Sequence, residues 1–137
     1  MPGTAYTDNL ISRAEAHGTA YQGPATVYMA LVTTTPDKTT PGTRATVASV
    51  AVALRTTNNS SEWTHDGAGS KTNTADMAWP DELTGDMDAD VVGIDIYDNA
   101  VPASGNRLRF ILLPSPKTFL SGQTPKFLAG DLVLSVA

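Results

Sequence analysis

Residues 4–36 read TAYTDNLISRAEAHGTAYQGPATVYMALVTTTP, and the expected fold can be built outward from them. Thr7 can cap the start of a helix, and Gly18 suits the position that follows a last helical turn. Apolar residues between them recur at helical spacing, so we predict a short helix over about residues 7–17. Three turns are marginal in isolation. We therefore expect this helix to lie on the apolar strand predicted over Val27–Thr33.

The rest of the chain predicts strands and turns rather than helices. One predicted strand has an apolar face of alternate residues, and two later strands repeat the pattern with polar residues facing outward. In these later strands we expect Asp95, Arg107 and Arg109 to face solvent. Pro114 is expected to end the second of them, because proline cannot donate to a strand ladder. The expected inner residues are Ala48, Val50, Val52 and Leu54, then Val92, Ile94 and Ile96, then Leu108, Phe110 and Leu112.

The remaining segments complete this pattern. Asn58–Ser70 is polar and predicts an exposed loop or hairpin, Thr72–Trp79 predicts a weaker strand, and Asp81–Asp90 predicts an acidic connection. A short segment at Lys117–Leu120 and a last strand at Asp131–Val136 follow. About seven strands without crossover helices predict a mainly β fold. We expect one domain over residues 1–137, an antiparallel β-sandwich or barrel-like sheet with a short N-terminal helix.

Composition excludes several classes of protein. Nine Lys and Arg against fourteen Asp and Glu give a net charge of −5, and the basic residues are scattered, so nucleic-acid binding is not expected. No apolar run is long enough to span a membrane, and the N-terminus has no signal-peptide pattern. The chain has no cysteine, which excludes disulfides, thiolate catalysis and cysteine metal sites.

The acidic connection contains the most suggestive local spacing. Asp86, Asp88 and Asp90 alternate, as carboxylates do at the start of a calcium loop. The sixth position is Val91 rather than glycine, and the twelfth is Tyr97 rather than glutamate, so an EF-hand is excluded. A looser cation site at Asp86, Asp88 and Asp90 is one hypothesis. The alternative is that these carboxylates are solvated and keep a sheet edge from pairing with another chain.

No catalytic constellation is evident in the sequence. The histidines are His17, expected at the helix end, and His65, in a polar loop; no Gly-x-Ser-x-Gly elbow accompanies them. Gly67–Lys71 lacks the spacing of a phosphate-binding loop. Asp95 and Asp98 could form a carboxylate pair, but an outward strand residue and a turn residue explain them equally. We therefore predict no catalytic residue, no cofactor and no enzyme.

The two tryptophans carry the remaining functional hypotheses. Trp79 precedes a proline at a strand end and is expected in the core. Trp63 lies among polar residues, where it could anchor a protein contact, since aromatic residues are enriched at interface hot spots. Alternatively, Trp63 could stack on a sugar ring beside Asn58 and Asp66.

Several segments also carry a resemblance. The chain resembles a family of small bacteriophage virion proteins, often labelled tail fibre or minor structural proteins, which share a short helix, an aromatic turn and a strand near the start. Residues 37–90 depart from the family pattern. The matching segments are GTAYQGPATVYMALVTTTP at residues 18–36, GIDIYD at 93–98, GNRLRF at 105–110 and FLAGDLVL at 127–134.

The resemblance implies a non-enzymatic virion structural protein, assembled in the bacterial host cytoplasm. The first hypothesis is a capsid decoration or head-accessory protein, a homo-oligomer docked on the major capsid protein. The alternatives are a tail-attached or receptor-proximal virion protein that contacts tail proteins, and a carbohydrate-binding module. We expect neither nucleic-acid nor membrane partners. The candidate partner contacts are Trp63, Tyr6, Pro36 and Pro41.

Overall fold

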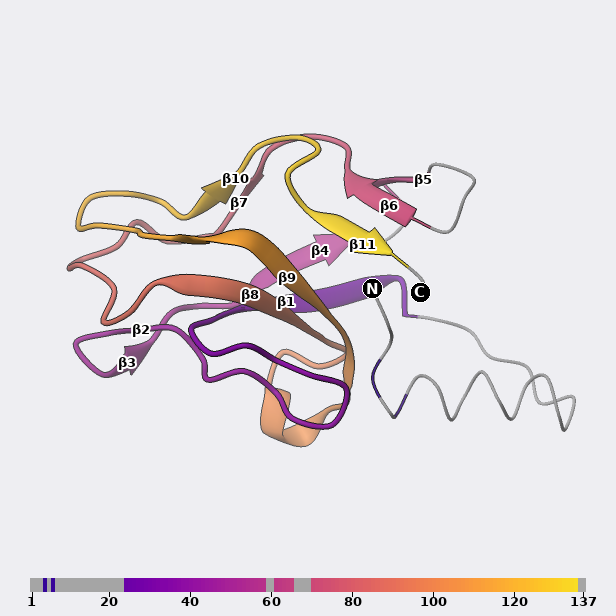
Figure 1. The fold of residues 1–137 in the computed structure, drawn as a ribbon, viewed down its shortest axis with the longest axis horizontal. Helices are drawn as coiled ribbons and strands as arrows, with labels where there is room; N and C mark the ends of the chain where they lie inside the picture. The colour runs from indigo at the N-terminus through magenta and orange to yellow at the C-terminus, as the bar shows by residue number, and fades with distance from the viewer. Residues whose placement is uncertain (1–3, 5, 7–23, 59–60, 66–69, 136–137) are drawn as a thin grey trace, which may run out of the picture.

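The main element of the fold is a four-stranded antiparallel sheet with strand order β4-β1-β8-β9 (Figure 1). A computed structural model describes residues 4, 6, 24–58, 61–65 and 70–135. The predicted helix over residues 7–17, with Thr7 and His17, lies outside these residues. The strands of the sheet are β1 (Thr26–Val32), β4 (Arg55–Asn58), β8 (Val91–Tyr97) and β9 (Arg107–Lys117).

Three smaller antiparallel sheets surround the main one. In Figure 1 the sheets β10-β7 and β11-β6-β5 lie together along one side of the main sheet, and the β2-β3 hairpin lies near its far end. The mainly β, antiparallel prediction is confirmed. The described residues form eleven strands rather than about seven, and their sheets do not close into a barrel. The smaller elements are β2 (Thr46–Val47), β3 (Val50–Ala51), β5 (Trp63–His65), β6 (Ser70–Asn73), β7 (Met77–Ala78), the 3-10 turn η1 (Pro102–Ser104), β10 (Lys126–Phe127) and β11 (Val133–Ser135).

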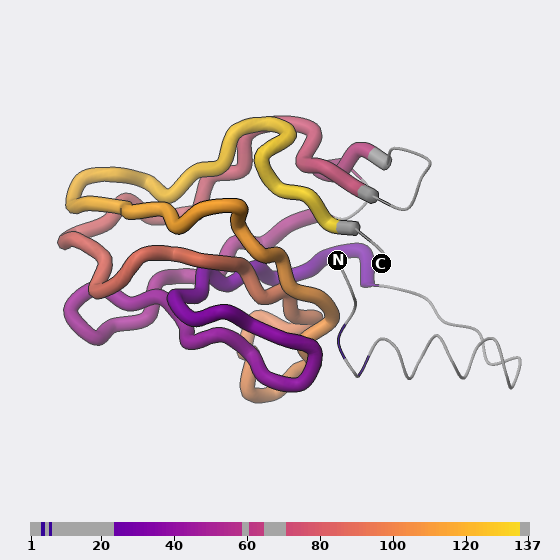
Figure 2. The backbone as a smooth tube through the Cα atoms, in the orientation of Figure 1, coloured from indigo at the N-terminus to yellow at the C-terminus, as the bar shows by residue number. Residues whose placement is uncertain are grey.

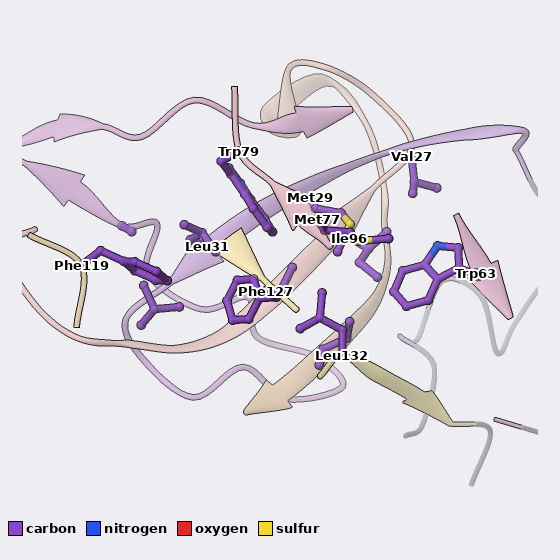
Figure 3. Close-up of a cluster of buried hydrophobic side chains, with 14 of the residues drawn as sticks. Val27, Met29, Leu31, Trp63, Met77, Trp79, Ile96, Phe119, Phe127 and Leu132 are labelled. Carbon is purple, nitrogen blue, oxygen red and sulfur yellow. The ribbon is translucent and has the colours of Figure 1, made fainter. Parts of the chain in front are cut away.

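The hydrophobic core fills the space between the main sheet and the small sheets. In the ladders of β8, Ile96 lies opposite Met29 and Ile94 opposite Leu31, so these side chains share one face. Aromatic residues from the other layer cover that face, and Trp79 and Phe127 meet edge to face at 5.6 Å (Figure 3). The predicted core position of Trp79 is thereby confirmed.

The opposite face of the main sheet is also covered, which corrects the prediction for Asp95. An irregular segment, residues 33–44, passes over this face (Figure 2), and Asp95 is 0 % exposed beneath it. The backbone amide of Gly42 donates to Asp95 Oδ2 at 2.8 Å. An added Cβ at Gly42 would lie 2.7 Å from Val32 Cβ, so the segment fits closely on the sheet. Asp95 is therefore an interior residue, and the prediction that it faces solvent is wrong.

The register of β9 corrects its predicted inner face. Ile94 pairs with Ile111, so Ile111 belongs to the core, whereas Phe110 is buried on the opposite face and Leu112 is half exposed. A register shift lies between Ile96 and Tyr97 in the ladder of β8 with β9. Because of this irregularity, Leu108 and Ile111 both lie in the core, although strict alternation would place them on opposite faces of β9.

Strand β9 also continues through Pro114 and Pro116 to Lys117. The prediction that Pro114 ends the strand is wrong, because β9 is an edge strand and, among the described strands, pairs with β8 alone in the sheet. Proline is tolerated where the missing N–H would face away from the ladder.

Two further predicted strands are divided. The strand predicted from Ala48 onward instead contains the turn of the tight β2–β3 hairpin, in which Ala48 and Ser49 have φ of 48° and 67°. Leu54 lies outside this hairpin, between β3 and β4. Thr72–Trp79 is interrupted after β6 and resumes as β7. The hairpin alternative for Asn58–Ser70 is confirmed, because β5 pairs with β6. The last predicted strand is present as β11, and the acidic connection contains no strand.

Candidate interaction surfaces

A groove of about 560 Å³ lies between the β2–β3 hairpin and residues 79–84. Trp79 and Leu83 are its buried residues, and Val50, at 70 % exposure, stands at its edge. Small apolar side chains from the hairpin dominate the hairpin side, and the opposite side carries carboxylates. The lining residues are Val47, Ala48, Val50, Ala51, Val52, Ala53, Trp79, Pro80, Asp81, Glu82, Leu83 and Thr84.

The groove follows an open strand edge. β3 has β2 as its only partner strand among the described residues. Val50 lies opposite Val47 across a two-residue turn, and the next bond in the ladder joins the Val52 amide to the Ala45 carbonyl at 2.9 Å. In an antiparallel ladder the intervening residue, Ala51, therefore directs its amide and carbonyl away from β2. This edge offers hydrogen bonds to an additional strand.

Asp88 fixes the conformation of this hairpin. Its carboxylate accepts hydrogen bonds from the Thr46 hydroxyl at 2.6 Å and from the amides of Ala48 and Ser49 at 3.1 and 2.9 Å. The hydrogen bond from Thr46, followed by that from the Ser49 amide, lowers the pKa of Asp88 below its ordinary value. The negatively charged Asp88 thus stabilises a turn whose two central residues both have positive φ.

The other two members of the acidic trio bind different segments. Asp86 accepts from the Ser121 amide at 2.8 Å, and Asp90 accepts from the Thr118 hydroxyl at 2.7 Å. Within the described part of the chain, no three histidine or acidic side chains are grouped as metal ligands. The alternation of Asp86, Asp88 and Asp90 in sequence therefore does not become a shared site, and each carboxylate holds its own loop.

A second cluster lies under residues 33–44. The Arg107 guanidinium donates to Asp95 Oδ1 at 3.0 Å and also to the Asp37 carbonyl, and its side chain is 9 % exposed. The guanidinium carbon lies 5.3 Å from the centre of the Phe110 ring. Burial raises the pKa of Asp95, although Arg107 and the Gly42 amide oppose that shift. The Asp95–Arg107 pair joins residues 33–44 to the sheet, so the expectation that Arg107 simply faces solvent is corrected too.

The predicted contact residues near this cluster differ in exposure. Tyr6, 39 % exposed, and Pro41, also exposed, both line a shallow cavity of about 510 Å³ beside Tyr97 and η1. Pro36 is buried against the sheet near Gly93, so it presents little surface to a partner. A partner role for Tyr6, Pro41 and Pro36 stays a prediction, and of the three Pro36 is buried.

Trp63 is the clearest departure from the expected surface. It lies in β5 and is 9 % exposed, at one end of the core near Val27 and Ile96 (Figure 3). The expectation that Trp63 stands in an exposed loop is therefore wrong, and its buried ring has little area left for a sugar or a protein. Of the other proposed sugar contacts, Asn58 ends β4, and Asp66 lies outside the described residues.

Sequence reasoning missed the groove and the Asp95–Arg107 cluster. The signal available for the groove was the run VAVAL at residues 50–54, whose apolar residues occupy both faces of the predicted strand. No comparable signal marked Arg107, because an irregular segment remote in sequence supplies its cover. Both features lie where a loop packs on another part of the fold. Among the described residues, neither the groove nor the Asp95–Arg107 cluster places a nucleophile beside a base.

Comparison with known protein families gives a match over nearly the whole chain. A family model described as podophage GP4 fiber I protein gp80 matches residues 3–135. No curated protein sequence matches the chain significantly. In the part of the chain that the structure covers, no helix is both long and apolar enough to cross a membrane.

Proposed function

Because the chain belongs to the podophage GP4 fiber I protein family, a family of small phage virion structural proteins, we propose that it is a tail-attached fibre component without enzymatic activity. The observation that carries this proposal is the extent of the match, which takes in nearly the whole chain, including residues 37–90. The middle of the chain, which departs from the resemblance in the sequence, is therefore covered by the same family model.

The fold supports a compact module rather than a fibrous shaft. The sequence has no repeat of the kind that builds a solenoid or a fibre. The strands of the described residues surround one hydrophobic cluster, and their loops are tied down by carboxylates such as Asp86 and Asp88. A module of this kind contributes to a virion through its surfaces, and it needs no chemistry of its own.

The other two functions considered from the sequence have less support. Head decoration, the first hypothesis, is compatible with membership of a virion family, but among the described residues no surface feature favours a capsid over a tail. The carbohydrate-binding alternative depended on an exposed Trp63, and that side chain is buried.

Copy number and position in purified particles test the proposal. Quantitative mass spectrometry against the major capsid protein measures copies per particle, and immunogold electron microscopy locates them. We expect a small copy number and label confined to the tail. Hundreds of copies with label over the head would replace the tail assignment with decoration. Absence from purified particles would refute a virion role altogether.

A further inference from the structure

We propose that the groove between β3 and residues 79–84 binds an extended segment of another virion protein, which adds a strand to the open edge of β3. The identity of the partner as a virion protein rests on the proposed function. The binding mode rests on the groove itself, where an open strand edge, an apolar lining and a carboxylate rim coincide.

The edge of β3 differs from the outer edge of β9, the edge strand of the main sheet. Exposed strand edges are normally blunted by proline, lysine or a bulge, because they would otherwise pair with another chain. β9 carries Pro114, Pro116 and Lys117 along its outer part. β3 and the residues after it, Val50–Ala53, carry none of these. The contrast within one molecule indicates that the β3 edge is left open for a partner.

The lining specifies the side chains that the groove accepts. A bound strand would present alternate side chains to the groove, because successive side chains of a strand point to opposite faces. Those side chains would meet Val47, Val52 and Leu83, which leave room for small β-branched residues. Main-chain hydrogen bonds would supply the affinity, and the apolar pockets would supply the specificity, as in other cases of strand addition.

The charge of the rim specifies the remaining positions. Asp81 and Glu82 are exposed and line one wall, and no lysine or arginine lines the groove. An occupant with Lys or Arg between its apolar residues would place opposite charges against this wall. A second copy of the chain fits poorly, because a two-fold pairing of grooves would bring Asp81 and Glu82 of both copies together.

The hairpin is prepared for such an occupant. The three hydrogen bonds to Asp88 hold Thr46, Ala48 and Ser49 in place beside the groove. Strand addition to a fixed edge avoids much of the ordering cost that binding otherwise carries.

Fluorescence anisotropy with three short labelled peptides tests the binding mode on the full chain. The first alternates Val and Lys, the second alternates Val and Glu, and the third is the Val-Lys peptide with methylated backbone nitrogens. We expect the first to bind at least about tenfold more tightly than either of the others, or about 1.4 kcal/mol. In hydrogen exchange, the Val-Lys peptide should slow the amides of Ala51 and Ala53.

Variants separate the edge from the rim. Asp81→Lys with Glu82→Lys should abolish the preference for Val-Lys over Val-Glu, and these exposed substitutions leave the core intact. Ala53→Pro removes an N–H from the proposed edge and should weaken binding of the Val-Lys peptide. The control Leu112→Asp changes an exposed apolar residue outside the groove and should leave binding unchanged.

Several results would overturn the inference. Equal affinity for all three peptides, no binding at all, or protection of amides away from Ala51 and Ala53 would each exclude strand addition. Protection of these two amides without peptide, together with a mass that rises with concentration, would assign the groove to a second copy.

Photo-crosslinking in purified particles separates this inference from the proposed function. A photoreactive amino acid at position 53 should join the chain to an apolar, basic segment of another virion protein, and the same group at position 112 should not. Crosslinks to an acidic segment, or none from particles that contain the chain, would refute the groove assignment alone. A chain missing from particles would refute the virion role, while the peptide assay would still decide whether the groove binds a strand.

Discussion

Removing one partner of the Asp95–Arg107 pair should destabilise the fold far more than removing a surface pair. Asp95 is fully buried and the Arg107 side chain nearly so, and their atoms lie 3.0 Å apart. Breaking such a pair leaves an uncompensated charge and costs about 3–5 kcal/mol. With an m-value of about 2 kcal/mol per molar urea, a loss of about 4 kcal/mol lowers the unfolding midpoint by about 2 M. We expect this shift for both Asp95→Ala and Arg107→Met.

Urea unfolding followed by tryptophan fluorescence measures the effect, because Trp63 and Trp79 both lie in the core. The double variant, Asp95→Ala with Arg107→Met, should lose much less than the sum of the two single losses, since neither charge is then left unpaired. Lys126→Met is the matched control. Lys126 lies 3.9 Å from Asp76 with both side chains about half exposed, and such pairs contribute at most about 1 kcal/mol.

The pH dependence of Arg107→Met gives a second check. Burial already raises the pKa of Asp95 above its ordinary value of 3.8, and loss of the guanidinium raises it further. A carboxyl whose pKa is higher in the folded than in the unfolded chain destabilises the fold most above its folded pKa. Its cost falls as pH drops toward the unfolded value. The deficit of Arg107→Met should therefore shrink on acidification. Additive single losses, or a deficit that does not change with pH, would refute the buried-pair argument.

Three further predictions concern polar groups that hold loops. Asn73→Ala removes three hydrogen bonds, to Ala75, Leu128 and Leu132, and should lower the free energy of unfolding by about 2–4 kcal/mol in urea titration; a loss below about 1 kcal/mol would contradict the assignment. Asp88→Ala should speed hydrogen exchange at the Ser49 amide while exchange in β8 stays unchanged. Unchanged exchange at Ser49 would show that the turn is stable without Asp88. The hydrogen bond from Arg55 lowers the pKa of Glu62, so its contribution to stability is present above about pH 4.5 and is lost as pH falls through the folded value. Glu62→Gln should flatten the pH–stability curve in that range, and an unaltered slope would exclude this contribution.

The sequence predicted the parts of the fold that repeat a regular pattern. β1 was located to within a residue at each end, because a run of seven mostly apolar residues follows a proline and precedes a turn-rich segment. β8 was located too, and Ile94 and Ile96 face the core as predicted, but the expectation that Asp95 on its other face is exposed was wrong. Alternation of apolar and polar residues indicates a strand with one solvent-exposed face, whereas β8 is buried on both faces.

The positions that were predicted wrongly, Asp95, Trp63 and the Ala48–Ser49 turn, depend on contacts that their local sequence does not show. Asp95 is buried because residues 33–44 cover it. That segment has no periodic sequence pattern from which its packing against the sheet could be predicted. Trp63 lies among polar neighbours in sequence, yet its own strand directs it inward to the core. The Ala48–Ser49 turn lacks the Asn-Gly or Gly signal of such hairpins. At this turn with positive φ angles, the amides of Ala48 and Ser49 donate hydrogen bonds to the carboxylate of Asp88, about forty residues away in sequence.

The acidic connection shows why local spacing was a poor guide to function here. Three alternate aspartates share a pattern with cation loops, but such a pattern makes a site only if the chain curls around one centre. Between Asp86 and Asp90 the chain instead runs past three different neighbours, the turn at Ser121, the β2–β3 hairpin and Thr118. The chain bends at Asp88 and Ala89 and is not a strand here, and the three carboxylates bind separate loops. The same carboxylates therefore order the hairpin beside the groove, and the open edge of β3 owes its fixed geometry to Asp88.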